Sequence, residues 1–301
     1  IPIIFLILPA KVQISPLIRY LCISRRIFKI TIDMYKSFFL SFFLLLAVFA
    51  TRAEGYVFER GIYYRPQHLG AYADSMCVLD IARPEGATSA PVLVWFHGGG
   101  LTGGRREVPR DLMHDGLIVV GVEYRLSPQV ATTEIIDDAA AAVAWTVRHI
   151  AQFGGDPTQV FIAGHSAGGY LVNMLALDKS WLGGYGVDAD SLAGVIPFSG
   201  QVITHFETRR AQGIQPLQPT IDRTAPLFHV RRDCPPMLIL SGDREKELYG
   251  RYEETAYFWR MMKLVGHPDV TLYEFDGFDH GSMALPGFAV TREFIKAHLR
   301  R

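Results

Sequence analysis

Short apolar runs rich in β-branched residues alternate with longer amphipathic stretches along the chain from Pro91 onward. This alternation is typical of strands joined by crossover helices, whereas a β-sandwich shows short strands separated by turns alone. Runs that are apolar throughout also fit strands that are covered on both faces, as in a parallel sheet. We therefore predict an α/β fold with a mainly parallel central sheet flanked by helices.

The expected elements follow from these runs and from the signals at their ends. Buried strands are predicted at residues 92–96, 117–123, 160–163, 194–198, 237–241 and 270–275, and two antiparallel edge strands at 56–64 and 77–81. A helix is predicted at 136–153, with Asp137 and Asp138 near its positive N-terminal end and Gly154 at its stop. Further helices are expected at 252–265 and 290–299.

Periodicity fades between Gly200 and Cys234, where Pro216, Pro219 and Pro226 interrupt the pattern. A structureless loop of this length inside a compact domain is uncommon and usually has a function. We predict that this insertion, residues 200–234, forms a short lid.

The N-terminal segment has a different pattern, and no Met precedes Met34. From Met34, Lys36 is followed by an apolar run at 38–50 and by small residues, which is typical of a secretory signal peptide. The run is shorter than the roughly 20 residues that span a bilayer, so stable membrane insertion is not expected. We predict upstream translation outside the gene for residues 1–33, a signal peptide for 34–53 and a folded domain for 54–301. The protein is then secreted or periplasmic.

Charge and cysteine content narrow the expected partners. The sequence holds 30 Lys and Arg and 30 Asp and Glu, so its formal net charge is zero and nucleic acid is not expected to bind. Cys77 and Cys234 lie in the exported part, where a disulfide is permitted, and the sequence leaves open whether they pair. Their spacing is not that of metal ligands, and no metal is expected. The oligomeric state also stays open.

Ser166 is the expected nucleophile. It stands in Gly164-His165-Ser166-Ala167-Gly168, between a predicted strand and a predicted helix. A serine on such a sharp turn exposes its hydroxyl, and the glycines leave room for the neighbouring strand and helix. The helix N-terminus behind it presents free N–H groups toward developing negative charge.

A serine hydroxyl needs a base, and in the order serine, acid, histidine both partners follow later in the chain. His280 follows the predicted strand 270–275, at the strand end where α/β sheets bind ligands, so it is the expected base. His205 and His229 in the insertion are its rivals. The loop after strand 237–241 offers Glu245, which we prefer as the acid because it stands a few residues beyond the strand, and Asp243 as the alternative.

The run His97-Gly98-Gly99-Gly100 follows the predicted strand 92–96 directly. Consecutive glycines let backbone N–H groups approach a substrate closely, as the stabilisation of a tetrahedral oxyanion requires. The N–H groups of Gly99 and Gly100, together with that of Ala167, are the expected oxyanion hole.

Four segments in this order carry a family resemblance: HGGG at 97–100, EYRLSP at 123–128, GGDP at 154–157 and GHSAGG at 164–169. Their combination resembles the hormone-sensitive-lipase and acetyl-esterase branch of the α/β hydrolases. The resemblance implies an α/β-hydrolase fold and hydrolysis of carboxylic esters without a cofactor. It assigns Ser166 and His280 as nucleophile and base and places the acid at Glu245, where many members have Asp.

The expected activity is therefore hydrolysis of short acyl esters through an acyl-enzyme. Little chain precedes the first predicted strand, which resembles compact esterases that act on acetylated or feruloylated sugars. A small-molecule or carbohydrate ester is thus the expected substrate. Two alternatives remain: an amide hydrolase like the arylformamidases, and a catalytically silent binding protein on the same fold.

Overall fold

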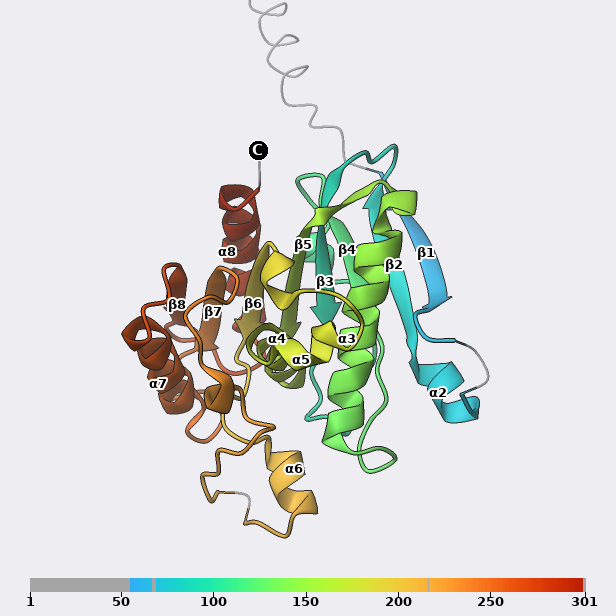
Figure 1. Ribbon diagram of the computed structural model, residues 1–301. Helices are drawn as coiled ribbons and strands as arrows, with labels where there is room; N and C mark the ends of the chain where they lie inside the picture. Colours follow the sequence, from blue (N-terminus) through green and yellow to red (C-terminus); the bar gives the residue numbers. More distant parts are fainter. Residues whose placement is uncertain (1–54, 67–68, 216, 300–301) are drawn as a thin grey trace, which may run out of the picture. The chain divides into compact units, whose positions relative to one another are not determined.

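The computed structural model describes residues 55–66, 69–215 and 217–299, and in this part of the chain eight strands form one sheet (Figure 1). The sheet order is β1-β2-β4-β3-β5-β6-β7-β8. The strands are β1 (Tyr56–Tyr63), β2 (Val78–Pro84), β3 (Ala90–Phe96), β4 (Ile118–Val122), β5 (Gly155–His165), β6 (Gly194–Phe198), β7 (Met237–Gly242) and β8 (Val270–Phe275). From β4 to β8 all neighbours are parallel, whereas β1 and β2 are antiparallel. The prediction of a mainly parallel sheet with two antiparallel edge strands is confirmed.

Helices cover both faces of this sheet. The α-helices of the described residues are α2 (Ala71–Met76), α3 (Thr132–His149), α4 (Ala167–Leu177), α5 (Lys179–Gly183), α6 (Phe206–Ala211), α7 (Arg251–Leu264) and α8 (Ala284–Ala297). On one face, Val94 and Ile162 pack with the alanine-rich side of α3. On the other, Trp95 packs against Phe198 at 5.2 Å and against Phe288 of α8 at 5.6 Å between ring centroids. None of the helices in the described residues has the length and apolarity needed to cross a membrane.

Helix α3 begins earlier than the sequence indicates. It starts at Thr132, where the Glu134 carboxylate accepts the N–H of Ala131 at 3.0 Å, and it ends at His149. A 3-10 helix, Ile150–Phe153, continues to a left-handed Gly154 with φ 82°. Asp137 and Asp138 therefore lie in its second turn and do not serve its N-terminal end. Asp138 is instead completely buried.

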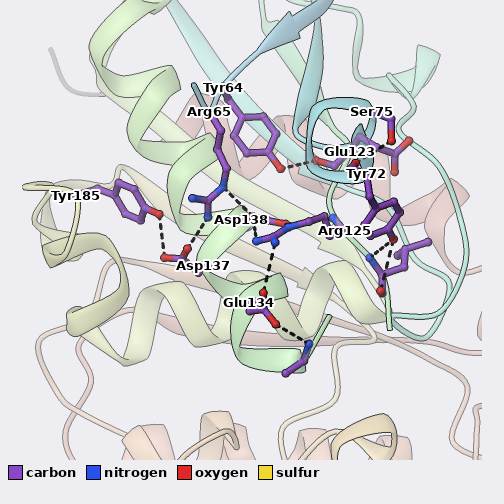
Figure 2. Close-up of polar contacts among 12 residues, drawn as sticks. Tyr64, Arg65, Tyr72, Ser75, Glu123, Arg125, Glu134, Asp137, Asp138 and Tyr185 are labelled. Atoms are coloured by element: carbon purple, nitrogen blue, oxygen red, sulfur yellow. Dashed lines mark hydrogen bonds and ion pairs between the residues drawn. The ribbon is translucent and has the colours of Figure 1, made fainter. Parts of the chain in front are cut away.

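The reason for that burial is a pair of guanidinium groups that converge on Asp138 (Figure 2). Arg125 approaches the two carboxylate oxygens with its Nε at 2.7 Å and its Nη2 at 2.8 Å, and Arg65 adds its Nε at 2.8 Å. Arg125 belongs to the segment that follows β4. The Asp138 cluster (Arg65, Arg125 and Asp138) thus fastens this segment and the chain after β1 to α3.

The insertion at residues 200–234 contains α6 and a short 3-10 helix, Pro226–His229, and α6 lies beyond the carboxyl ends of the central strands (Figure 1). The N-terminal part of the insertion is anchored. The N–H groups of Val202 and Ile203 both donate to Glu254 at 3.1 Å, and Ser127 Oγ donates to Glu207 of α6 at 2.6 Å. The predicted lid is therefore a segment with fixed attachments to α7 and to the chain after β4.

The predicted domain bounds and the two cysteines can be compared with the structure. The described residues form one compact unit. The predicted upstream segment 1–33 and the signal peptide 34–53 lie outside the described residues. Cys77 and Cys234 are both buried and free, so they do not pair with each other.

Candidate functional site

Ser166 occupies the turn between β5 and α4. Its backbone has φ 55° and ψ −110°, a region that residues with a side chain rarely adopt. Two hydrogen bonds hold the turn: the Ser166 N–H donates to the carbonyl of Phe198 at 2.8 Å, and the Tyr170 N–H donates to the Ser166 carbonyl at 2.9 Å. The surrounding sheet and helix thus fix the strained serine.

The glycines around Ser166 are required by close approach of backbone to backbone. A Cβ atom at Gly168 would lie 2.0 Å from the carbonyl oxygen of Phe96. At Gly164 it would lie 2.5 Å from the carbonyl carbon of Gly168, and at Gly169 it would lie 2.7 Å from Cα of Gly200. The expectation that this turn has no room for side chains at its glycines is met in the structure.

His280 lies beside Ser166, as expected. It stands in the loop between β8 and α8, and its Nε2 is 2.9 Å from Ser166 Oγ. The two rival histidines have other contacts. His205 caps α6 by accepting the N–H of Glu207, and His229 donates to the carbonyl of Arg223 at 2.8 Å.

The carboxylate beside His280 belongs to Glu247, so the prediction of Glu245 is wrong, and so is the alternative, Asp243. Glu247 Oε2 lies 2.8 Å from His280 Nδ1, and the Glu247 side chain is completely buried. Glu245 is exposed. Asp243 holds the loop together by accepting the N–H of Glu245 at 2.9 Å and that of Gly277 at 2.7 Å.

Local geometry explains the difference. The chain after β7 makes one helical turn, in which the N–H groups of Lys246 and Glu247 both donate to the carbonyl of Asp243 at 2.9 Å. A residue four places beyond Asp243 therefore returns toward the strand end, whereas one two places beyond it points to solvent. The available signal was a turn-forming Asp followed four residues later by Glu.

Ser199 is a site residue for which the sequence offers no signal. It directly follows β6, has φ 46° and is completely buried. Its Oγ lies 2.9 Å from His280 Nδ1, on the side of the ring that also faces Glu247. The arginine at position 251 of α7 donates a hydrogen bond to the Ser199 carbonyl and so holds this residue in place.

Burial and hydrogen bonding set the charges of the site. Burial raises the pKa of Glu247, but hydrogen bonds from His280 and Ser199 outweigh it and hold that pKa at about 2. Burial, followed by the neighbouring His280, lowers the pKa of His165 to about 4. His165 is therefore neutral at pH 7, and its Nε2–H donates to the backbone carbonyl of His280 at 2.7 Å.

The glycine loop after β3 lies against Ser166. A Cβ atom at Gly98 would be 3.4 Å from Cβ of Ser166, and one at Gly99, which has φ 119°, would be 2.1 Å from the carbonyl oxygen of Gly103. Among the contacts of the described residues, none uses the N–H of Gly99 or Gly100. Ala167 is the first residue of α4, so its N–H has no acceptor within the helix. These three N–H groups are available to a ligand beside Ser166.

A cluster of His97, Tyr124 and Glu123 holds the glycine loop in place. The His97 ring stacks on Tyr124 with 4.3 Å between centroids, and the Tyr124 hydroxyl donates to the His97 carbonyl at 2.7 Å. His97 Nε2 is 2.9 Å from Glu123, whose other oxygen accepts the N–H of Arg106 at 3.0 Å. The segment at 123–128 thus holds the glycine loop, and the Asp138 cluster holds that segment in turn (Figure 2).

A cavity of about 570 Å³ lies between α6 and the chain before α3. Its wall carries hydroxyl and amide groups, from Ser127, Gln129, Thr132, Thr133, Thr208 and Gln212, beside apolar residues and the charged Glu134, Glu207 and Arg210. It adjoins the glycine loop, because the Ser127 N–H donates to the Leu101 carbonyl at 2.8 Å and a Cβ atom at Gly100 would be 2.9 Å from the Phe206 ring of α6. Within the described residues, no group of three or more His, Cys, Asp or Glu is arranged to hold a metal ion.

Comparisons with solved structures agree on the fold. A truncated carbohydrate esterase from gut microbiota matches with a TM-score of 0.69 at 17% identity, over 83% of this chain and 98% of that one. Esterase 2 of Thermogutta terrifontis matches with a TM-score of 0.63 at 21% identity, over 79% of this chain and 94% of that one. These likenesses confirm the predicted α/β-hydrolase fold.

Sequence comparisons agree on the family. Esterase LipC of Mycobacterium tuberculosis is 26% identical over 263 residues, which are 79% of this chain and 63% of that protein. The probable carboxylic ester hydrolase LipM of the same organism is 31% identical over 179 residues, 51% of this chain and 41% of that protein. The chain thus spans less than two thirds of the length of these curated relatives. The model of the Carboxylesterase family matches residues 64–220, which is more than half of the chain, and the protein therefore belongs to this family.

Proposed function

We propose that this protein is a serine carboxylic-ester hydrolase and that Ser166, His280 and Glu247 form its catalytic triad. The observation that carries the proposal is the continuous hydrogen-bonded chain from Ser166 Oγ through both ring nitrogens of His280 to the buried Glu247 carboxylate. A serine, a base and an orienting carboxylate at such distances are the geometry by which a hydroxyl becomes a nucleophile.

The geometry supports a two-step reaction. His280 Nε2 takes the proton of Ser166 Oγ while that oxygen bonds to the acyl carbon, and Glu247 stabilises the imidazolium that results. The N–H groups of Gly99, Gly100 and Ala167 donate to the oxyanion of the tetrahedral intermediate. His280 then gives its proton to the departing alcohol, and a water molecule activated in the same way releases the acid from Ser166.

The test of the nucleophile is Ser166→Ala on 4-nitrophenyl acetate. Removal of the nucleophilic oxygen is expected to lower kcat by roughly 10⁴-fold or more. Ser180→Ala, at an exposed serine in the first turn of α5, is the matched control and is expected to retain full activity. Turnover by Ser166→Ala at the level of the parent protein refutes the proposal.

The hydroxyl and amide groups in the wall of the cavity beside α6 support an alcohol part with several hydroxyls, so the proposed substrate is a short acyl ester of a carbohydrate. Hydroxyl and amide side chains such as Gln129 and Thr133 can exchange hydrogen bonds with sugar hydroxyls. One of the structural relatives is described as a carbohydrate esterase. An extracellular sugar ester is also consistent with the export predicted from Met34.

Matched substrates test this specificity. Gln129→Ala with Thr133→Val is expected to lower kcat/KM for acetylated xylotriose about ten-fold and to leave 4-nitrophenyl acetate unchanged, because only the sugar reaches the cavity. Gln152→Ala, at an exposed position outside the cavity wall, is the control. Equal losses on both substrates contradict a sugar subsite. N-formylkynurenine in the same assay separates an ester hydrolase from an arylformamidase.

A further inference from the structure

A second groove lies at the β1–β2 edge of the sheet, away from Ser166. Its volume is about 670 Å³, and its wall comes from β1, β2 and the segment 106–114. Strand register places Phe58 opposite Ala82, and Asp80 opposite Gly121, on the face that α8 covers farther along the sheet. Here the segment after β3 covers this face instead, because a Cβ atom at Gly121 would be 2.2 Å from the carbonyl oxygen of Glu107.

Positive charge exceeds negative charge in this groove. Arg60, Arg106 and Arg110 line it with two carboxylates, Asp80 and Glu107. Two of the arginines share Asp80, with Arg106 Nε at 3.1 Å and Arg60 Nη1 at 3.6 Å. Among the contacts of the described residues, the Arg110 guanidinium has no hydrogen bond or ion pair. Arg106 Nη1 also lies 4.0 Å from Glu123 Oε2, so the guanidinium with which no carboxylate of the described residues pairs is that of Arg110.

Both carboxylates are further engaged by the protein. Asp80 Oδ1 accepts the Gly61 N–H at 2.7 Å, and Glu107 accepts the indole N–H of Trp95 at 3.3 Å. An anion that enters the groove competes with Asp80 and Glu107 for the guanidinium groups. Both carboxylates keep a hydrogen bond from another donor when an arginine turns to the anion. Planar guanidinium groups bind carboxylates in a two-point geometry, which makes a carboxylate ligand the natural complement of this wall.

An apolar floor lies beside these charges. Phe58 is 38% exposed, and the Arg60 guanidinium lies 4.8 Å from the centroid of its ring. Tyr56 is held in the same wall by a hydrogen bond from its hydroxyl to the Leu117 carbonyl at 2.9 Å. An inorganic ion would leave the exposed Phe58 ring uncovered, whereas a ligand with a ring next to its charge covers both.

We propose that this groove binds a ring-bearing organic carboxylate, a chemistry that uronic-acid saccharides and aromatic acids share. The ligand is separate from the ester that Ser166 attacks. Arg106 of the groove wall donates its backbone N–H to Glu123, and Glu123 in turn contacts His97 at the start of the glycine loop. Glu123 and His97 therefore lie between the groove and the glycines of that loop. The proposal does not depend on the proposed ester hydrolysis.

Calorimetric titration of the full chain tests the proposal, with trigalacturonate and ferulate as the two carboxylates. At least one is expected to bind saturably, and which of them binds identifies the source. Arg60→Gln and Arg110→Gln are each expected to weaken binding about ten-fold or more, and binding is expected to weaken as salt is raised. Hydrolysis of 4-nitrophenyl acetate by both variants is expected to be unchanged.

Three controls make the result decisive. Arg232→Gln removes one positive charge at an exposed position outside the groove and is expected to leave the affinity unchanged. Xylotriose, which has rings but no carboxylate, is expected not to bind, and Tm values verify that the variants fold. The proposal is overturned if neither carboxylate binds, if inorganic sulfate binds as tightly, or if both groove variants keep the parent affinity.

Discussion

Three carboxylates within five residues follow β7, and only the direction of each side chain separates their roles. Asp243 accepts two backbone N–H groups, Glu245 is exposed, and Glu247 is buried against His280. Ser199, from the end of a different strand, reaches the same ring nitrogen. The base therefore has its orientation set by two groups that lie far apart in the sequence.

Glu247→Gln is expected to lower kcat/KM for 4-nitrophenyl acetate by roughly 10³- to 10⁴-fold, because an amide no longer stabilises the charged imidazolium. Glu245→Gln is the matched control, since it makes the same chemical change two residues away, and it is expected to keep full activity. Steady-state kinetics of the two purified variants decide the matter. If Glu245→Gln is the inactive one, the assignment reverts to Glu245.

At the scale of elements, α3 connects the edge of the sheet to the site. Its buried Asp138 holds Arg125, which stands in the same segment as Glu123 and Ser127 (Figure 2). Glu123 supports the glycine loop through His97, and Ser127 contacts α6 of the insertion. One carboxylate on a helix thus organises two walls of the site.

Asp138→Ala is expected to destabilise the protein by about 3–5 kcal/mol, because it leaves Arg65 and Arg125 without their buried counter-charge. Asp137→Ala provides the comparison. Its side chain is 41% exposed and bonds to Arg65 and Tyr185, so a loss of about 1 kcal/mol or less is expected. Urea unfolding followed by tryptophan fluorescence measures both. Equal losses in the two variants speak against the Asp138 cluster as the dominant contact.

At the scale of the whole molecule, stability is expected to fall as the pH decreases below neutrality. The pKa of His165 is lowered from 6.5 to about 4, first by burial, so between these values the unfolded chain binds more protons than the folded one. Stability then decreases with decreasing pH in that window. The pKa of Glu247, held at about 2 against an ordinary 4.5, extends the loss between pH 4.5 and 2. Burial also lowers the pKa of His205, so this residue, like His165, makes stability decrease as the pH falls.

The contribution of His165 can be isolated. When the pH falls from 7 to 5, protonation of His165 in the unfolded chain is expected to lower the free energy of unfolding by about 2 kcal/mol. This value follows from the lowering of its pKa from 6.5 to about 4 and from the linkage relation. His165→Gln retains an N–H donor for the His280 carbonyl but does not titrate, so its free energy of unfolding is expected to change less over the same interval. Urea titrations of both proteins at pH 7 and pH 5 make the comparison. An unchanged pH dependence in the variant contradicts the neutral buried state of His165.

Local pattern was sufficient for the strands, the serine turn and the position of the base. Strands β6 and β8 begin and end at the predicted residues. Strand β6 is apolar and buried throughout, whereas β8 alternates apolar and polar residues and is a half-exposed edge strand, not the predicted buried strand. Ser166 and His280 could be placed because Ser166 directly follows β5 and His280 lies in the loop that follows β8, and parallel strands bring their carboxyl ends to one edge of the sheet.

Tertiary structure decided which groups meet at that edge. Whether Glu245 or Glu247 reaches His280 depends on one turn of backbone after β7, and a difference of two residues reverses the side-chain direction. The burial of Asp138, the contact of Ser199 and the unpaired state of Cys77 and Cys234 likewise depend on distances between segments remote in sequence. Periodicity and local motifs report the conformation of a segment and the face it buries. The sheet order and the loops that cross its edge determine which side chains from different segments come within hydrogen-bonding distance.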